Sequence, residues 1–131
     1  MLSKGFLPAT LPADPMPLFE EWFAGARKAK AQPNPDAMSL ATATPDGRPS
    51  VRVVLCRKLI ASPGYVVFFT NYDSRKGAEL AANPRAAAVI HWDAFGRQVR
   101  LEGPIVRSPG AESDEYFASR ALDSRIGAWA S

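Results

Sequence analysis

The spacing of apolar residues predicts an amphipathic helix near the start of the chain. Its apolar positions recur every three or four residues, at Phe19, Trp22, Phe23 and Ala26. Asp14 followed by Pro15 is typical of a helix N-cap and the first helical residue. Prolines cannot continue a helix, so we expect this helix to end within residues 31–36, which read AQPNPD.

From residue 38 the pattern changes to runs of β-branched and aromatic residues between turn signals, which is typical of strands. MSLATAT and the long run PSVRVVLCRKLI should form a hairpin around a turn at residues 45–47. Three more strands are expected further along the chain. The predicted strands cover residues 38–44, 49–60, 65–70, 85–93 and 97–106.

Two more helices are expected after the third and the fifth of these strands. One covers residues 74–82 and ends at Asn83-Pro84. The other is amphipathic, begins near Ser108-Pro109 and extends to about residue 121, with Tyr116 and Phe117 on its inner face. Closing an antiparallel sheet into a barrel removes its exposed edges, so we expect a mainly β fold, a small antiparallel barrel with peripheral helices.

The composition fits one domain of 131 residues, 47% of them hydrophobic. Residues 1–13 are rich in Pro and Ala and are expected to form a flexible arm before a domain over residues 14–131. No apolar run approaches the ~20 residues that span a bilayer, and the N-terminus lacks the apolar core of a signal peptide. We therefore expect no membrane segment and no leader.

Cysteine, histidine and charge narrow the possible chemistry. Cys56 is the single cysteine, which excludes an intrachain disulfide and makes a reducing compartment, the cytoplasm, the default. One cysteine and one histidine also argue against a zinc site, and no metal is expected. The net charge of +3 fits an anionic ligand, but the cations are scattered, which argues against nucleic acid. The nucleotide motifs GxGxxG and the P-loop are not in the sequence.

The run from Arg52 to Arg57 is the first candidate site. Alternate side chains of a strand share a face, so Arg52, Val54 and Cys56 point one way and Val53, Leu55 and Arg57 the other. Burying an unpaired arginine is costly. Either both arginines reach water at the strand ends, or they bind an anion, such as a phosphate or an electron-rich ring edge.

Arg75 and Lys76 lie side by side where a strand ends and a helix begins. A helix N-terminus favours an anion, and Thr70, Asn71 and Ser74 supply neutral donors nearby. A phosphate site and a solvated turn both remain open for this pair.

Gln98, Tyr116 and Arg120 are weaker candidates. Gln98 could bind an amide-bearing ring edge or lie exposed on its strand. Tyr116 and Arg120 are four residues apart and would share one helix face, where they could hold a phosphate or make an ordinary surface contact.

The ordered segments of this chain resemble the pyridoxamine 5′-phosphate oxidase family from about Asp14 to Ser131. The segments are DPMPLFEEWF, AMSLATATPDGRPSVRVVL, FFTNYDSRKGAELAANPRAA, RQVRLEG, YFASR and SRIGAWAS. The resemblance implies a split β-barrel that holds FMN at a homodimer interface. It also implies oxidation of pyridoxamine or pyridoxine phosphate at the 4′ carbon, with transfer of a hydride to the flavin and reoxidation by O₂ to give pyridoxal phosphate and peroxide.

The resemblance also assigns residues. Those implied to contact FMN are Arg52, Val53, Val54, Leu55, Cys56, Arg57, Phe69, Thr70, Arg75, Lys76 and, from across the interface, Gln98. Those implied to hold the phosphate of the substrate are Arg57, Tyr116, Arg120 and Ser124. No residue is assigned a catalytic role.

Three departures from the family keep other functions open. Arg57 stands where lysine is common, and Ala121 stands where proline is common. A further C-terminal segment normally follows the position of Ser131, so we expect the sequence to be part of a longer chain. The alternatives are another FMN-binding split-barrel enzyme that reduces a different substrate with a nicotinamide donor, and a non-catalytic module that binds FMN.

Overall fold

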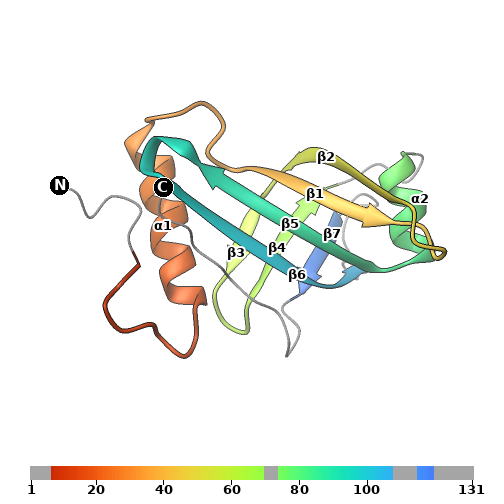
Figure 1. The fold of residues 1–131 in the computed structure, drawn as a ribbon, viewed down its shortest axis with the longest axis horizontal. Helices are drawn as coiled ribbons and strands as arrows, with labels where there is room; N and C mark the ends of the chain where they lie inside the picture. The colour runs from red at the N-terminus through yellow and green to blue at the C-terminus, as the bar shows by residue number, and fades with distance from the viewer. Residues whose placement is uncertain (1–6, 70–73, 108–114, 120–131) are drawn as a thin grey trace.

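The structure, a computed structural model, describes residues 7–69, 74–107 and 115–119 (Figure 1). The helices are α1 (Met16–Ala29) and α2 (Arg75–Ala82), with a short 3-10 helix, η1 (Asp93–Phe95). The strands are β1 (Ala37–Ala43), β2 (Pro49–Leu55), β3 (Lys58–Ile60), β4 (Tyr65–Phe69), β5 (Arg85–Trp92), β6 (Arg97–Arg107) and β7 (Glu115–Ser119). Apart from two corrections given below, the helices and strands agree with the sequence prediction to within one or two residues.

Helix α1 begins where its sequence predicts and ends at Ala29, two residues before the segment 31–36 in which its end was expected. The Asp14 carboxylate accepts a hydrogen bond from the backbone N–H of Met16 at 3.0 Å, and the Pro15 carbonyl accepts the first helical bond, from Phe19. Lys30 ends the helix in the left-handed conformation. The buried face of α1 consists of Met16, Phe19, Trp22, Phe23 and Ala26.

The hairpin of β1 and β2 is also confirmed. Its strands pair from Ala37 opposite Leu55 to Ala43 opposite Pro49. Gly47 has a φ of 94° in the turn, and a Cβ there would meet no atom within 4 Å. The turn therefore requires glycine for its backbone conformation rather than for space.

The prediction of one strand over residues 49–60 is wrong, because the chain breaks into β2 and β3. The N–H of Cys56 donates to the carbonyl of Asp36 beside β1, whereas the next N–H, of Arg57, donates to the carbonyl of Val67 in β4. Two residues thus carry the chain from one end of the sheet to the other. The sequence has no glycine or proline at this break. The break arises because the sheet closes into a barrel, so that the chain passes from one outermost strand to the other.

The predicted helix near residues 108–121 is also wrong where the structure describes it. Residues 115–119 form β7, which pairs with β4 on one side and with the last residues of β6 on the other. Tyrosine and phenylalanine favour strands, and β7 satisfies the backbone groups of two neighbours that would otherwise be edges. Residues 108–114, 120 and 121 lie outside the described residues.

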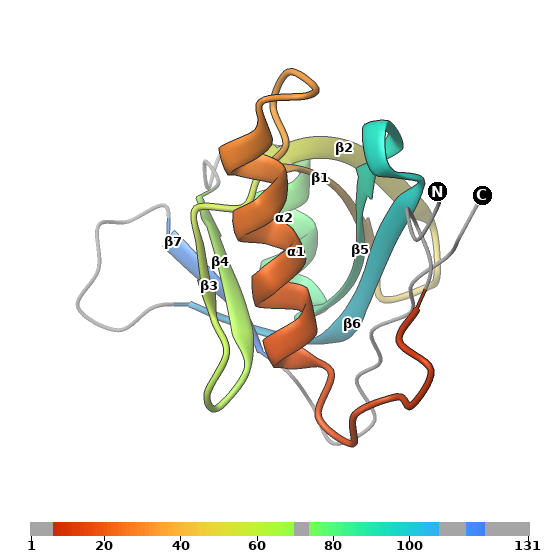
Figure 2. The same ribbon diagram turned by 90° about the vertical axis from the view of Figure 1, so that its left-hand side faces the viewer.

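The strands form one antiparallel sheet in the order β2-β1-β5-β6-β7-β4-β3. The sheet curls into a barrel, and its two outermost strands, β2 and β3, are consecutive in the chain. Figure 2 shows α1 lying across one opening of the barrel, while α2 lies at the opposite end. This is the split barrel with peripheral helices that was expected.

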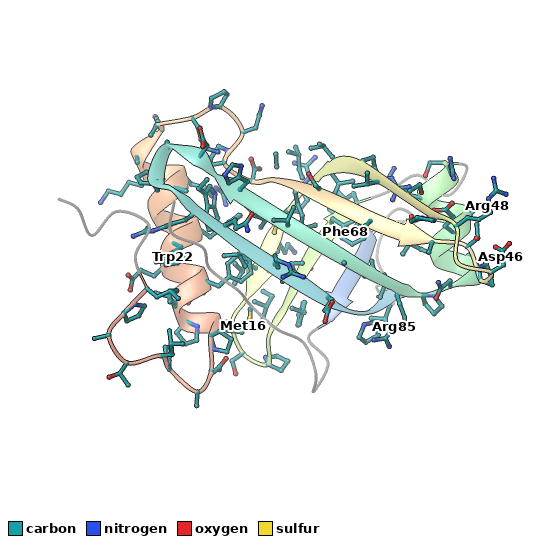
Figure 3. All side chains as sticks on the ribbon, in the orientation of Figure 1. Met16, Trp22, Asp46, Arg48, Phe68 and Arg85 are labelled. Carbon is teal, nitrogen blue, oxygen red and sulfur yellow. The ribbon has the colours of Figure 1, made fainter. Side chains whose placement is uncertain are left out.

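The core lies inside this barrel and beneath α1. Its largest fully buried side chains include Trp92, Phe19, Phe68, Met16, Met38 and Leu40, and Figure 3 marks Met16 and Phe68. The rings of Phe19 and Phe23 lie 6.4 and 6.3 Å from that of Trp92, and its indole N–H donates to the carbonyl of Pro35 at 2.8 Å. These contacts hold α1 and the α1–β1 loop against the sheet.

The start of the chain lies outside the helices and strands of the described part. Residues 7–13 form neither helix nor strand and are exposed, whereas residues 1–6 lie outside the described residues, so the flexible arm stays a prediction. Among the residues described, neither helix has the length and apolar character needed to cross a bilayer.

Candidate functional site: an anion site between β2 and α2

Arg52 lies on the inner face of β2, close to the end of the barrel where α2 packs. Register places Leu40 opposite Arg52 and Thr42 opposite Ser50 on the paired strands. One terminal nitrogen of Arg52 donates to the Leu40 carbonyl at 3.1 Å and to Thr42 Oγ1 at 2.7 Å. The other donates to Ser50 Oγ at 2.6 Å. The side chain remains 22% exposed, so the guanidinium is fixed but still reaches solvent.

Glu79 of α2 closes this cluster from the helix side, with a side chain that is only 6% exposed. Its Oε1 accepts hydrogen bonds from Thr42 Oγ1 at 2.6 Å and from Ser50 Oγ at 2.7 Å, and lies 3.7 Å from Arg52. Its Oε2 accepts from Arg75 Nε at 3.0 Å. One buried carboxylate therefore connects two strands of the barrel wall with the first turn of α2.

The surroundings of Glu79 keep it ionised. The hydrogen bonds from Thr42 and then Ser50 lower the pKa of this carboxyl from 4.5 to about 2, with a further contribution from Arg75 and against the opposing effect of burial. Hydrogen bonds to the charged form favour that form. Glu79 therefore carries a full negative charge at neutral pH.

The N-terminus of α2 adds two more cations. The Ser74 hydroxyl caps the helix by accepting from the N–H of Gly77 at 3.1 Å, and Lys76 Nζ lies 3.4 Å from the same oxygen. Arg75 is 63% exposed beyond its bond to Glu79. Arg52, Arg75 and Lys76 together with Glu79 leave a net charge of +2 at a helix N-terminus, which is an arrangement suited to an anion.

The rest of the run 52–57 divides between the core and the outer surface. Val54 and Cys56 point inward and are buried, whereas Val53 and Leu55 point outward and are exposed. Burial raises the pKa of the Cys56 thiol to about 12, with the charge of Asp36 adding to the effect and Arg27 opposing it. Of this run, Arg52 is thus the one polar side chain that the structure aims at the cluster.

Arg57 lies apart from the cluster, on the outer side of the break between β2 and β3. Its side chain is exposed, and the guanidinium carbon lies 5.4 Å from the centre of the Phe69 ring. The ring supports the cation through its π face while leaving the guanidinium edges open. Arg57 and Phe69 therefore form a second cationic surface feature, outside the Glu79 cluster.

Of the remaining predicted site residues, those that the structure describes are not brought to the cluster. Gln98 is partly buried at the start of β6, next to the β5–β6 turn, and Figure 1 shows this turn beside α1, opposite to α2. Tyr116 lies in β7, paired with Phe68 and Arg107, and not on the helix face predicted for it and Arg120. Thr70, Asn71, Arg120 and Ser124 lie outside the described residues.

Sequence reasoning missed Glu79, Thr42 and Ser50. The available signal was the spacing of Arg75 and Glu79, which are four residues apart and thus on one helix face. Nothing in the sequence linked that face to Thr42 and Ser50. Within the described ranges, no three histidine, cysteine or acidic side chains lie close enough together to hold a metal ion.

The fold places the chain in a class, the FMN-binding split-barrel proteins. The sequence profile described as pyridoxamine 5′-phosphate oxidase matches residues 26–131. This chain belongs to that family, whose members are FMN-dependent oxidoreductases.

Curated relatives agree with this assignment. The chain is 56% identical over 122 residues to the pyridoxine/pyridoxamine 5′-phosphate oxidase of Rhodospirillum rubrum, a match that covers 90% of this chain and 60% of that protein. It is 52% identical over 123 residues to the enzyme of the same name from Sphingopyxis alaskensis, covering 94% of this chain and 56% of that protein. The chain thus spans a little over half the length of these relatives.

Solved structures support the fold. PhzG from Burkholderia lata, in complex with tetrahydrophenazine-1-carboxylic acid, superposes with a TM-score of 0.69 at 33% identity, over 82% of this chain and 50% of that one. A pyridoxamine 5′-phosphate oxidase-related, FMN binding protein from Nostoc punctiforme has a TM-score of 0.64 at 19% identity, over 79% of this chain and 52% of that one. The second likeness concerns the fold alone.

Proposed function

We propose that this chain belongs to an enzyme that oxidises pyridoxamine 5′-phosphate or pyridoxine 5′-phosphate to pyridoxal 5′-phosphate, with FMN as cofactor and O₂ as electron acceptor. The names of the relatives at 52–57% identity support the substrate class. The observation that carries the proposal is the convergence of Arg52, Arg75 and Lys76 around one end of the barrel.

The donor set fits the phosphate of FMN. A phosphate monoester carries a charge of about −1.5 to −2 at neutral pH, close to the opposite of the net charge of the cluster. Arg52 would supply the N–H groups that its protein partners leave open, and Arg75 its two terminal nitrogens. Lys76, Ser74 and the first backbone N–H groups of α2 would complete the site.

Bound FMN would supply the redox chemistry, a two-electron oxidation at the 4′ carbon of the substrate with O₂ as the final acceptor. The residues of this chain would bind the cofactor and the substrate and orient them. Arg57, held over Phe69, offers a planar fork for the phosphate of the substrate.

We further propose that FMN is bound between two copies of the chain. Val51 and Val53 on the outer face of β2 are 67% and 66% exposed, and Leu55, Phe69 and Val106 are exposed as well. A row of apolar side chains of this kind is typical of a covered surface. Gln98 lies at the end of the barrel away from α2, so it would reach a flavin most directly from a second copy.

Analytical ultracentrifugation tests this arrangement. The wild type should sediment as a dimer, and Val53→Glu should weaken the association of the two copies. A monomeric wild type with FMN bound would exclude this arrangement.

Titration of the purified protein with FMN tests the proposed function, followed by an assay of pyridoxal phosphate formation from pyridoxamine phosphate in air. Lys76→Gln should weaken FMN binding about tenfold, the effect of losing one charged hydrogen bond. Lys28→Gln is the matched control, because Lys28 is an exposed lysine of α1, at the opposite end of the barrel. A protein that stays colourless with excess FMN, or equal effects of the two variants, would overturn the proposal.

A second candidate is the oxidation of a different ring compound. The likeness to PhzG at 33% identity supports it, because that structure holds tetrahydrophenazine-1-carboxylic acid. Incubation of the FMN-loaded protein with each substrate class under air separates the two candidates. Peroxide release with the phenazine precursor and none with either B6 phosphate would favour the second.

A further inference from the structure

We propose that Glu79 is a positioning residue of the phosphate site, whose ionised carboxylate holds the guanidinium groups of Arg52 and Arg75 in the orientation that binds an anion. This inference rests on the proposed function, because it names what prepares the site for the phosphate of FMN. Neither the sequence pattern nor the family assignment gives Glu79 a role.

A carboxylate in an anion site is unexpected on charge alone. Its negative charge opposes the approach of a phosphate, and burying a carboxylate is costly unless it is fully hydrogen-bonded. Glu79 meets that condition, because Thr42, Ser50 and Arg75 all donate to it. Glu79 weakens the electrostatic attraction for the ligand, and yet both of its oxygens are hydrogen-bonded. Its contribution to binding must therefore be to orient the neighbouring side chains.

The geometry of Arg52 supports this role. Its hydrogen bonds to Leu40, Thr42 and Ser50 use three of the five N–H groups of a guanidinium. Thr42 and Ser50, which accept from Arg52, also donate to Oε1 of Glu79. The carboxylate therefore orients both hydroxyls so that their lone pairs face Arg52. The guanidinium stays in one rotamer, with N–H groups left over for a ligand.

Arg75 is held differently. Only its Nε is engaged by Glu79, at 3.0 Å across one turn of α2, and the side chain is otherwise mostly exposed. The two terminal nitrogens are left for an anion beside the helix N-terminus. Glu79 thus holds the long side chain of Arg75, which would otherwise sample many rotamers, in one orientation. This lowers the conformational entropy that Arg75 loses when an anion binds.

The same carboxylate is not the sole tie between α2 and the barrel. Asn83, at the end of α2, donates from Nδ2 to the carbonyl of Ala43 in β1 at 3.3 Å, and Leu80 is buried in the core. Helix α2 should therefore stay in place in Glu79→Gln, a variant that keeps the shape of the side chain but removes its charge and replaces one acceptor oxygen with an NH₂ donor.

The test compares Glu79→Gln with two controls. Glu21→Gln makes the same change in net charge on the exposed face of α1, and Ile90→Val destabilises the core away from the cluster. FMN affinity is measured by loss of flavin fluorescence. If Glu79 positions the arginines, Glu79→Gln binds FMN about tenfold more weakly in spite of the added positive charge, and both controls bind like wild type. Equal or tighter binding by Glu79→Gln would overturn the inference.

A second measurement separates this inference from the proposed function. In ligand-free protein, the Nε–H resonance of Arg75, assigned with Arg75→Lys, should be sharp and protected from exchange in wild type and Glu21→Gln, and lose that protection in Glu79→Gln. Unchanged protection refutes the positioning role whether or not FMN binds. Wild type that fails to bind FMN refutes the proposed function alone. If Glu79→Gln does not fold, Ser50→Ala, which removes one partner from both Glu79 and Arg52, should weaken FMN binding several-fold, and unchanged affinity would count against the role.

Discussion

The thiol of Cys56 should be almost unreactive in the native protein. It lies where the chain crosses from β2 to β3, with a side chain that is 1% exposed and Sγ 3.5 Å from the carbonyl oxygen of Lys58. Its surroundings raise the thiol pKa from 9.0 to about 12. Only the thiolate reacts with disulfide reagents. The pKa shift therefore sets a lower limit on how much more slowly Cys56 reacts in the folded protein than in the unfolded chain.

The size of the effect follows from the two pKa values. At pH 8 a thiol with the ordinary value is about 10% ionised, whereas a thiol with a pKa near 12 is about 0.01% ionised, a ratio of roughly a thousand. Exclusion of the reagent by the core adds to this ratio. Cys56 is the single cysteine of the sequence, so labelling reports on one site.

The assay compares the rate of labelling by a chromogenic disulfide at pH 8 in native protein and in guanidinium chloride. Native labelling should be at least about a thousandfold slower than labelling of the unfolded chain. It should also keep rising with pH above 9, where an exposed thiol levels off. A native rate within about tenfold of the unfolded rate, while circular dichroism shows a folded protein, would refute the burial of Cys56 and the inward face assigned to this part of the chain.

Three further predictions concern stability and binding. Trp92→Phe removes the hydrogen bond to the Pro35 carbonyl and should lower the free energy of unfolding in urea by about 1–3 kcal/mol; a change below about 0.5 kcal/mol would contradict the contact. The carboxyl of Glu79 has a pKa lowered from 4.5 to about 2, so the stability it contributes is present above pH 4.5 and is lost as the pH falls through 2. Stability should therefore fall more steeply over this range in wild type than in Glu79→Gln, and parallel curves would refute the shift. Arg57→Ala removes an exposed cation–π contact with Phe69 and should cost less than about 1 kcal/mol of stability, while weakening pyridoxal phosphate binding in an equilibrium titration; unchanged affinity would exclude Arg57 from the substrate site.

Local signals carried most of the fold prediction. The spacing of the buried residues in α1 and the turn around Gly47 are properties of short segments, and both led to correct elements. The break between β2 and β3 and the strand β7 have no such signal. A short run such as EYFAS suits a helix or a strand, and its place between β4 and β6 decides the matter.

The candidate site also contains residues that have a local sequence signal and residues that have none. Arg52, Arg75 and Lys76 are candidates from the sequence, because a cation within an apolar strand and a pair of cations at a helix start are both visible there. Glu79 could not be identified in this way, because the hydroxyls that hold it, on Thr42 and Ser50, are 37 and 29 residues away in the chain. A carboxylate becomes part of an anion site only once the barrel wall and α2 have met.

The late position of β7 in the chain has a consequence for synthesis. This strand fills an interior place in the sheet, so the edges of β4 and β6 stay unpaired on the ribosome until residue 119 has emerged. Exposed strand edges attract other chains, and pairings between distant segments form slowly. A nascent chain stalled before residue 115 should therefore depend on chaperones. The strands up to β6, which ends at Arg107, have then been synthesised, but the barrel is still open.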